Sequence, residues 1–198
     1  MKTLRTIAFI LFLSLLISVS EAETAGKQVL DFDDFTVECA VGTPVQKNAK
    51  TEGAVWLTFF PAFCVNNSTD ININCIWRPG TWDIASIPDE DIQRMNDSVL
   101  EETRRSFQAM GIGVRDMVVH CCGKSVIGGR NAICLVKSFT LFRGTDPAGT
   151  NGFPVNLVQG QWNVSADRGT YVFTATTHTM EELIYGIVPI MESLRWKP

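Results

Sequence analysis

Three pairs of strand-like segments, each joined by a turn, most constrain what this chain can fold into. The pairs are residues 55–60 with 71–77, 114–127 with 131–142, and 155–164 with 171–176. Each pair flanks a cluster of Gly, Asn, Asp or Ser residues, which is typical of β-hairpins. Because hairpins join neighbouring strands that run in opposite directions, they predict a mainly antiparallel sheet.

Two amphipathic helices are expected to cover this sheet. Residues 86–110 carry apolar side chains at steps of three and four, with the Ser86 hydroxyl as an N-terminal cap and Gly111 as a stop. Thr179, followed three residues later by Glu182, is a capping box that begins a second helix. Together, the hairpins and the two helices predict an α+β fold, with an antiparallel sheet of about seven strands and two helices packed on it.

The N-terminus resembles an export signal. Lys2 and Arg5 precede an apolar run at residues 7–19, and small residues follow. A helix of that length rises about 20 Å, which is short of a hydrocarbon core of about 30 Å. We therefore expect residues 1–22 to be a cleaved signal peptide, and residues 23–198 to be a single periplasmic or secreted domain without stable membrane insertion.

The charge balance limits the class of partner. The chain has a net charge of −4, with 17 basic and 21 acidic residues. A mildly acidic chain without a basic run is a poor candidate for binding nucleic acid or anionic lipid. We expect a protein partner and no nucleic acid.

All six cysteines lie after the leader, at Cys39, Cys64, Cys75, Cys121, Cys122 and Cys134. An even number in an exported domain indicates disulfide bonds. If the first hairpin turns between residues 69 and 70, Cys64 and Cys75 lie opposite one another at a separation that a disulfide can bridge. That pair is our first prediction.

The remaining cysteines leave the connectivity open. Successive side chains of a strand point to opposite faces, so Cys134 can reach at most one of Cys121 and Cys122. The other cysteine would then pair with Cys39, stay free, or form a strained bond with its neighbour.

Three local phrases, together with the order of elements, carry a family resemblance. They are SVIGGRNA at residues 125–132, GTYVFTAT at 169–176 and MESLRW at 191–196. With them the chain resembles the PsbP-like fold group, which includes the DcrB-like periplasmic proteins, over residues 35–196. The six cysteines and the long loop at 144–154 depart from that group. The resemblance implies a sheet with helices on its faces, used mostly as a non-catalytic adaptor, assembly factor or binding partner.

The chain offers few groups for catalysis. His120 and His178 are its two imidazoles. His120 and Cys121 are expected to point to opposite faces of a strand, which argues against a catalytic cysteine with a histidine base. The adjacent Cys121 and Cys122 lack the spacing of ligands in a zinc site. His178 is interpreted as a helix-start residue. We therefore predict no catalytic residue, no metal ligand, no cofactor and no enzymatic activity.

An acidic segment near the start of the domain has two interpretations. Asp31, Asp33 and Asp34 could contribute oxygen ligands to a calcium ion. The glycine and distal glutamate of a calcium-binding loop are missing, so we interpret the segment as a solvated connection.

Two connections are candidate binding surfaces. Trp82 lies in a turn-forming stretch near Arg78, where a large ring is expected to be exposed and suits a protein interface. The loop at 144–154, with Asp146 and Phe153, is long for a loop without structure of its own, which indicates a function.

These observations lead to three hypotheses. The first is a non-enzymatic binding or accessory protein, periplasmic or secreted, that acts through protein–protein contacts. The second is an inhibitor or immunity protein against an exported toxin or hydrolase. The third, from a different class, is a small-ligand carrier or hydrolase with a pocket between sheet and helix.

Overall fold

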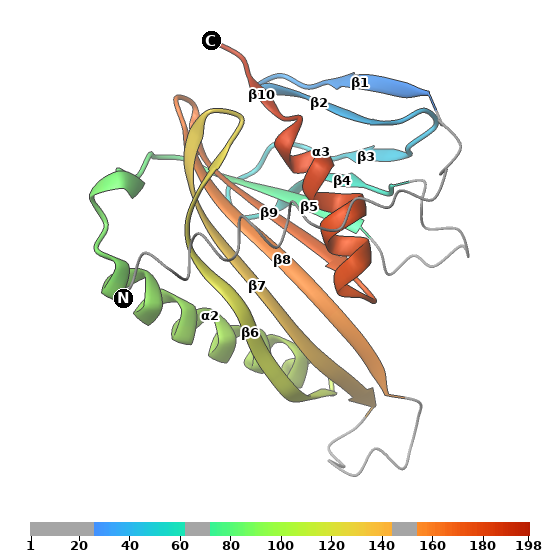
Figure 1. Ribbon diagram of the computed structural model, residues 1–198, viewed down its shortest axis with the longest axis vertical. Coiled ribbons are helices and arrows are strands. Elements are labelled where there is room, and N and C mark those ends of the chain that lie inside the picture. Colours follow the sequence, from blue (N-terminus) through green and yellow to red (C-terminus); the bar gives the residue numbers. More distant parts are fainter. Residues whose placement is uncertain (1–25, 62–71, 144–153) are drawn as a thin grey trace, which may run out of the picture.

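A seven-stranded antiparallel sheet forms the centre of the computed structural model, which describes residues 26–61, 72–143 and 154–198 (Figure 1). In order across the sheet, its strands are β3 (Val45–Lys47), β4 (Val55–Phe59), β5 (Asn72–Arg78), β9 (Gly169–Thr177), β8 (Val155–Ala166), β7 (Arg130–Arg143) and β6 (Ile112–Ile127). All neighbouring strands are antiparallel. The predicted α+β fold with an antiparallel sheet is confirmed.

A second, three-stranded sheet lies beside the first, in the order β1-β2-β10. Its strands are β1 (Lys27–Asp31), β2 (Phe35–Ala40) and β10 (Arg195–Trp196). The alternating pattern of residues 35–41 predicts β2, whereas β1 was not predicted and reaches the acidic segment only at Asp31. Since β10 comes from the other end of the chain, both ends of the described domain meet in this small sheet (Figure 1).

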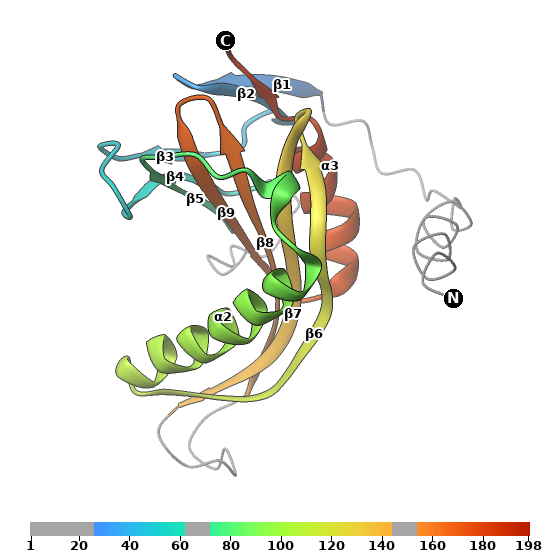
Figure 2. The same ribbon diagram turned by 90° about the vertical axis from the view of Figure 1, so that its left-hand side faces the viewer.

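The helical elements lie on opposite faces of the large sheet, as Figure 2 shows. They are η1 (Ile84–Ser86), α2 (Asp89–Ala109), a π-helical turn η2 (Glu182–Ile187) and α3 (Val188–Glu192). On one face α2 packs its Ile92 against Ile133 of β7. On the other, η2 and α3 bury Leu183, Ile187 and Met191 in the main core. Within the described ranges, no helix is long and apolar enough to cross a bilayer.

One helix start is confirmed and the other is wrong. The Glu182 N–H donates to the Thr179 hydroxyl at 3.1 Å and the Glu182 carboxylate accepts from the Thr179 N–H at 3.0 Å, which is the predicted capping box. At α2 the Ser86 hydroxyl instead donates to the carbonyl of Asp83 at 2.9 Å. Because Ser86 ends the short 3-10 turn η1, α2 begins three residues later without a side-chain cap.

The register behind the predicted Cys64–Cys75 pair is also wrong. Cys75 lies opposite Leu57 in the β4–β5 pair, and Cys64 lies outside the described residues. The buried positions of Leu57 and Cys75 fix this register, which runs unbroken from Leu57 to Phe59, and the bulge between Val55 and Leu57 lies farther from the turn. The five described cysteines are free thiols: Cys39, Cys75, Cys121, Cys122 and Cys134.

Aromatic side chains fill the space between the two sheets. Phe35 of β2 is fully buried at the centre of this cluster. Its ring centroid lies 5.9 Å from Trp56, 6.2 Å from Tyr171, 5.5 Å from Phe173 and 5.5 Å from Trp196. Edge-on ring pairs of this kind contribute about 0.5–1.5 kcal/mol each beyond their burial. Phe35 therefore anchors the small sheet on the large one.

A lysine is buried on the other face of the sheet, under α2. Lys137 of β7 is 1% exposed, and its ammonium donates to the Thr103 hydroxyl at 2.7 Å. The Thr103 hydroxyl in turn donates to the carbonyl of Val99 at 2.7 Å. Burial disfavours the charged ammonium and lowers the pKa of Lys137 to about 8.

This burial predicts a pH-dependent effect of Lys137→Met. Between pH 8 and 10.5 the unfolded chain keeps the Lys137 proton while the native state has lost it, so the wild-type protein gains stability with rising pH. Methionine lacks this gain. The variant should be more stable than wild type at pH 7, and its advantage should shrink by about 3 kcal/mol by pH 10.5. Urea denaturation at several pH values measures this, and a pH-independent difference would contradict it.

Candidate functional site

Asp34, directly before β2, is a buried carboxylate, with its residue only 4% exposed. It lies between Phe32 and Phe35, whose rings are both buried in the aromatic cluster. Because both rings pack into the core, Asp34 between them is buried as well. The interpretation of this segment as solvated is therefore wrong at Asp34, although Asp31 and Asp33 are exposed.

Two cations and a phenol surround the Asp34 carboxylate. Lys50, from the connection between β3 and β4, forms an ion pair with one carboxylate oxygen. The Arg168 guanidinium, from the β8–β9 turn, lies 3.4 Å from the other oxygen. The Tyr171 hydroxyl of β9 donates a hydrogen bond to the same carboxylate. Residues far apart in the sequence thus satisfy a single buried charge.

The Lys50 ammonium also lies among aromatic rings. It is 4.7 Å from the centroid of Trp56, 4.9 Å from Trp77 and 5.3 Å from Tyr171. Cation–π attraction at such distances is stronger where water is excluded, and the Lys50 side chain is 25% exposed. The rings and Asp34 together hold Lys50 in place.

This arrangement keeps Asp34 ionised. Burial by itself raises the pKa of Asp34. Hydrogen bonds from Lys50, Tyr171 and Arg168, together with the positive charge of Lys50, outweigh burial and hold this pKa below its usual value. The pKa of Tyr171 is raised by its burial and by its hydrogen bond to Asp34. At neutral pH the carboxylate is charged and the phenol is protonated.

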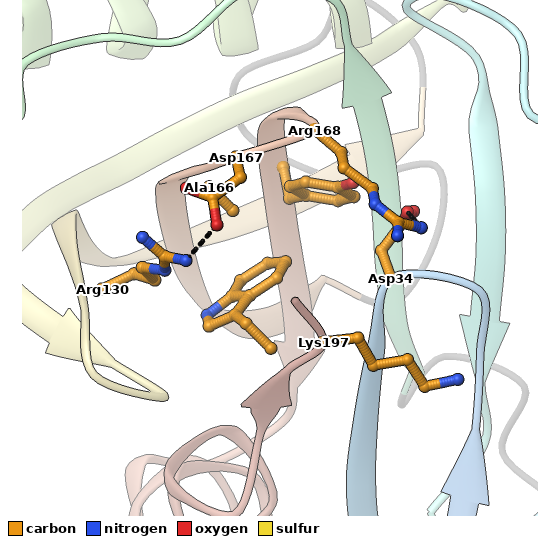
Figure 3. A pocket seen from close by; sticks show the side chains of 8 residues that line it. Asp34, Arg130, Ala166, Asp167, Arg168 and Lys197 are labelled. Atoms are coloured by element: carbon orange, nitrogen blue, oxygen red, sulfur yellow. Dashed lines mark hydrogen bonds and ion pairs between the residues drawn. The ribbon is translucent and has the colours of Figure 1, made fainter.

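A small pocket lies above this network, at the end of the large sheet where the β6–β7 and β8–β9 turns meet the C-terminus (Figure 3). It is lined by Asp34, Arg130, Ala166, Asp167, Arg168, Tyr171, Trp196 and Lys197, and we call this surface the charged end. Arg130 forms an ion pair with Asp167, and Arg168 donates to the carbonyl of Pro198 at 3.0 Å. The pocket volume of about 10 Å³ is the size of one water molecule.

Trp82 and Arg78 border the charged end. Trp82 is 43% exposed, and its backbone N–H donates to the Ser165 hydroxyl at 2.8 Å, one residue before Ala166 of the pocket. Arg78 is exposed at the end of β5 and lies opposite Thr170, which in turn lies opposite Ser165. The sequence-predicted exposure of Trp82 is confirmed, and its backbone is tied to the sheet.

The second predicted contact region attaches elsewhere. Asp146 and Phe153 lie outside the described residues, but the strands that flank them end at Arg143 and begin at Val155. Val155 is the first residue of β8, whereas Ser165 beside Trp82 is near its last. Ten residues of strand separate them by about 34 Å. The structure therefore places Trp82 and Arg78 at one end of the large sheet and the flanks of this loop at the other.

The predicted orientation of His120 is wrong. The β6–β7 pairing shifts between Val119 and Cys121, so His120 is an extra residue in a β-bulge, and its Nε2 lies 2.8 Å from the Ser138 hydroxyl. His120 and Cys121 consequently face the same side of the sheet. At the second histidine, the His178 N–H donates to the Glu182 carboxylate at 2.9 Å, as expected at a helix start.

The described residues contain no cluster of three or more His, Cys, Asp or Glu side chains suited to a metal ion. The acids of the segment considered for calcium each pair with a cation. Asp33 lies 3.2 Å from Lys47, and Asp31 forms an ion pair with Lys197. The Asp33–Lys47 pair therefore crosses the junction of the two sheets, whereas the Asp31–Lys197 pair lies within the small one.

Comparison with known proteins gives a likeness among solved structures. No protein-family model matches the sequence, and no curated protein matches it. Among solved structures, cyanobacterial PsbP (CyanoP) from Synechocystis sp. PCC 6803 superposes with a TM-score of 0.59 at 10% sequence identity, covering 92% of this chain and 99% of that one. The fold is PsbP-like.

The PsbP-like fold that the resemblance implied is confirmed. A further match is a protein of unknown function, PA94 from Pseudomonas aeruginosa, with a TM-score of 0.35 and 13% identity over 87% of this chain and 98% of that one. Asp34, Lys50 and Arg168 of the charged end and its network were not predicted from the sequence as a site. Only the flanking Phe32 and Phe35 signalled that Asp34 would be buried.

The network predicts that Asp34→Asn is costly. The substitution leaves the partly buried Lys50 without its carboxylate, so the free energy of unfolding at pH 7 should fall by about 3 kcal/mol. Asp33→Asn is the matched control, because the Asp33 side chain is 63% exposed and its pair with Lys47 should contribute less than about 1 kcal/mol. Urea denaturation of both variants measures the difference.

The same experiment has a defined pH dependence. Because the native pKa of Asp34 is depressed, its stabilising effect is present above the unfolded pKa of about 3.9 and is lost as the pH falls through the native pKa. Wild type and Asp34→Asn should therefore converge in acid. Equal costs for the two asparagine variants at pH 7 would refute the role of Asp34.

Proposed function

We propose that this chain is a non-enzymatic binding or accessory protein, acting outside the cytoplasm, that contacts another protein through the charged end and Trp82. The observation that carries the proposal is the exposed Trp82 ring on a backbone tied to Ser165. A rigid aromatic side chain with an arginine nearby suits the centre of a protein interface, because it buries a large area at little cost in conformational entropy.

The form of the site favours a surface contact over a bound small molecule. The pocket at the charged end has the volume of about one water molecule, and its charges are already paired within the protein. A drug-sized ligand occupies a cleft of about 300–1,000 Å³. Both features support protein binding over carriage or hydrolysis of a small ligand at this surface.

The location rests on the sequence and on the fold. The leader at residues 1–22 has the composition of an export signal, and the family resemblance includes periplasmic proteins. The PsbP-like fold supports an accessory role, as the resemblance implies. An inhibitor of an exported hydrolase is a specialised kind of binding protein, so this alternative falls within the same proposal. The identity of the partner distinguishes an inhibitor from a general accessory protein.

A photo-crosslinking amino acid at position 82 tests the contact. Placed there in material from the envelope or culture medium of the source organism, it should link one specific protein, whereas the same group at Tyr185, 63% exposed on η2, should not. With that partner purified, Trp82→Ala should weaken binding at least tenfold and Tyr185→Ala should leave it unchanged. Equal binding by wild type and Trp82→Ala would overturn the proposal.

A further inference from the structure

Cys121 of β6 and Cys134 of β7 are neighbours on adjacent strands. In the β6–β7 register Cys134 lies opposite Gly123, and Cys121 lies opposite Val136, so the two cysteines are diagonal neighbours. Their side chains are in contact, because the Cys134 thiol donates a hydrogen bond to the Cys121 sulfur. The register and this hydrogen bond therefore place the two thiols side by side on adjacent strands.

The bulge at His120 determines which cysteine meets Cys134. The His120 side chain contacts Ser138, which is four residues after Cys134 in a strand that pairs regularly with β8, so Ser138 and Cys134 share a face. Cys121 lies on that face too. Cys122 lies on the other, where its sulfur is 3.9 Å from the carbonyl of Ile92 in α2. The sheet itself therefore separates Cys122 from Cys134.

The two thiols differ in reactivity. The hydrogen bond from Cys134 lowers the pKa of Cys121 to about 7, although burial opposes this shift. The pKa of Cys134 is raised by the same hydrogen bond and by its burial. Cys121 is also on the edge strand β6, whereas Cys134 is on a strand paired on both sides. The more accessible sulfur is thus the one that is a thiolate near neutral pH.

We propose that Cys121 and Cys134 are a reversible redox pair, in which Cys121 is the attacking sulfur and Cys134 the resolving one. The oxidant is a disulfide, either a small molecule such as oxidised glutathione or the disulfide of an oxidoreductase. This inference concerns the edge of the large sheet and does not depend on the proposed function of the charged end.

The reaction is a thiol–disulfide exchange in two steps. The Cys121 thiolate attacks one sulfur of the external disulfide, whose S–S bond breaks and releases one thiolate. Cys134 then loses its proton to solvent and attacks the Cys121 sulfur, which releases the second thiolate and forms the Cys121–Cys134 bond. Two cysteines are oxidised by two electrons, and the external disulfide is reduced to two thiols.

Peptide mapping of the full-length protein after treatment with oxidised glutathione tests the pairing. In wild type and in the Cys122→Ser control, mass spectrometry should find a Cys121–Cys134 crosslink that dithiothreitol removes. The crosslink should be absent in Cys121→Ser and in Cys134→Ala. A crosslink that survives in Cys121→Ser but not in Cys122→Ser would overturn the proposal. The absence of any crosslink in wild type and in Cys122→Ser would overturn it as well.

The rate of alkylation by iodoacetamide gives a second readout that does not require the crosslink to form. Followed by mass spectrometry in the Cys122→Ser background, alkylation of Cys121 should reach half its maximum near pH 7. Adding Cys134→Ala should move this midpoint upward, toward the value of about 8.5 for a free cysteine. An unchanged midpoint would show that Cys134 does not activate Cys121.

Discussion

The buried carboxylate of Asp34 is the constraint on which the junction of the two sheets depends. Phe32 and Phe35 bring it under the surface, and a charge in that position must be paired. Lys50 and Arg168 supply the pairing from two different turns of the large sheet. The same contacts order the β8–β9 turn and the C-terminus, where the N–H of Lys197 donates to the Asp34 carbonyl at 2.9 Å. These contacts tie the charged end to the small sheet at Asp34.

Much of the fold could be predicted because its signals are local. The two glycines at 128 and 129 both adopt positive φ, as the tight β6–β7 turn requires. The apolar spacing of α2 and the Thr179–Glu182 capping box each lie within one element, so neither depends on distant parts of the chain. The exposure of Trp82 follows in the same way from the turn formers around it.

The remaining features depend on contacts between distant residues, which no local pattern records. β1 forms by pairing with β2, and its two apolar residues, Val29 and Leu30, are adjacent and show no alternation of their own. Lys50 is 16 residues from Asp34, and Arg168 is 134 residues from it. The bulge at His120 depends on the register of β6 against β7, so sequence alternation alone assigned His120 and Cys121 to opposite faces. Almost all residues of the candidate site are brought together by such contacts between distant parts of the chain.

The pKa of the Asp34 carboxyl group tests the central claim most directly. Carbon-detected NMR can follow each aspartate of the folded protein through an acid titration, with the exposed Asp33 as an internal reference. The network of Lys50, Tyr171 and Arg168 predicts a pKa for Asp34 below its usual value of 3.8. A pKa at or above that value would show that burial outweighs the ion pairs, and that Asp34 does not hold the two sheets together as a charge.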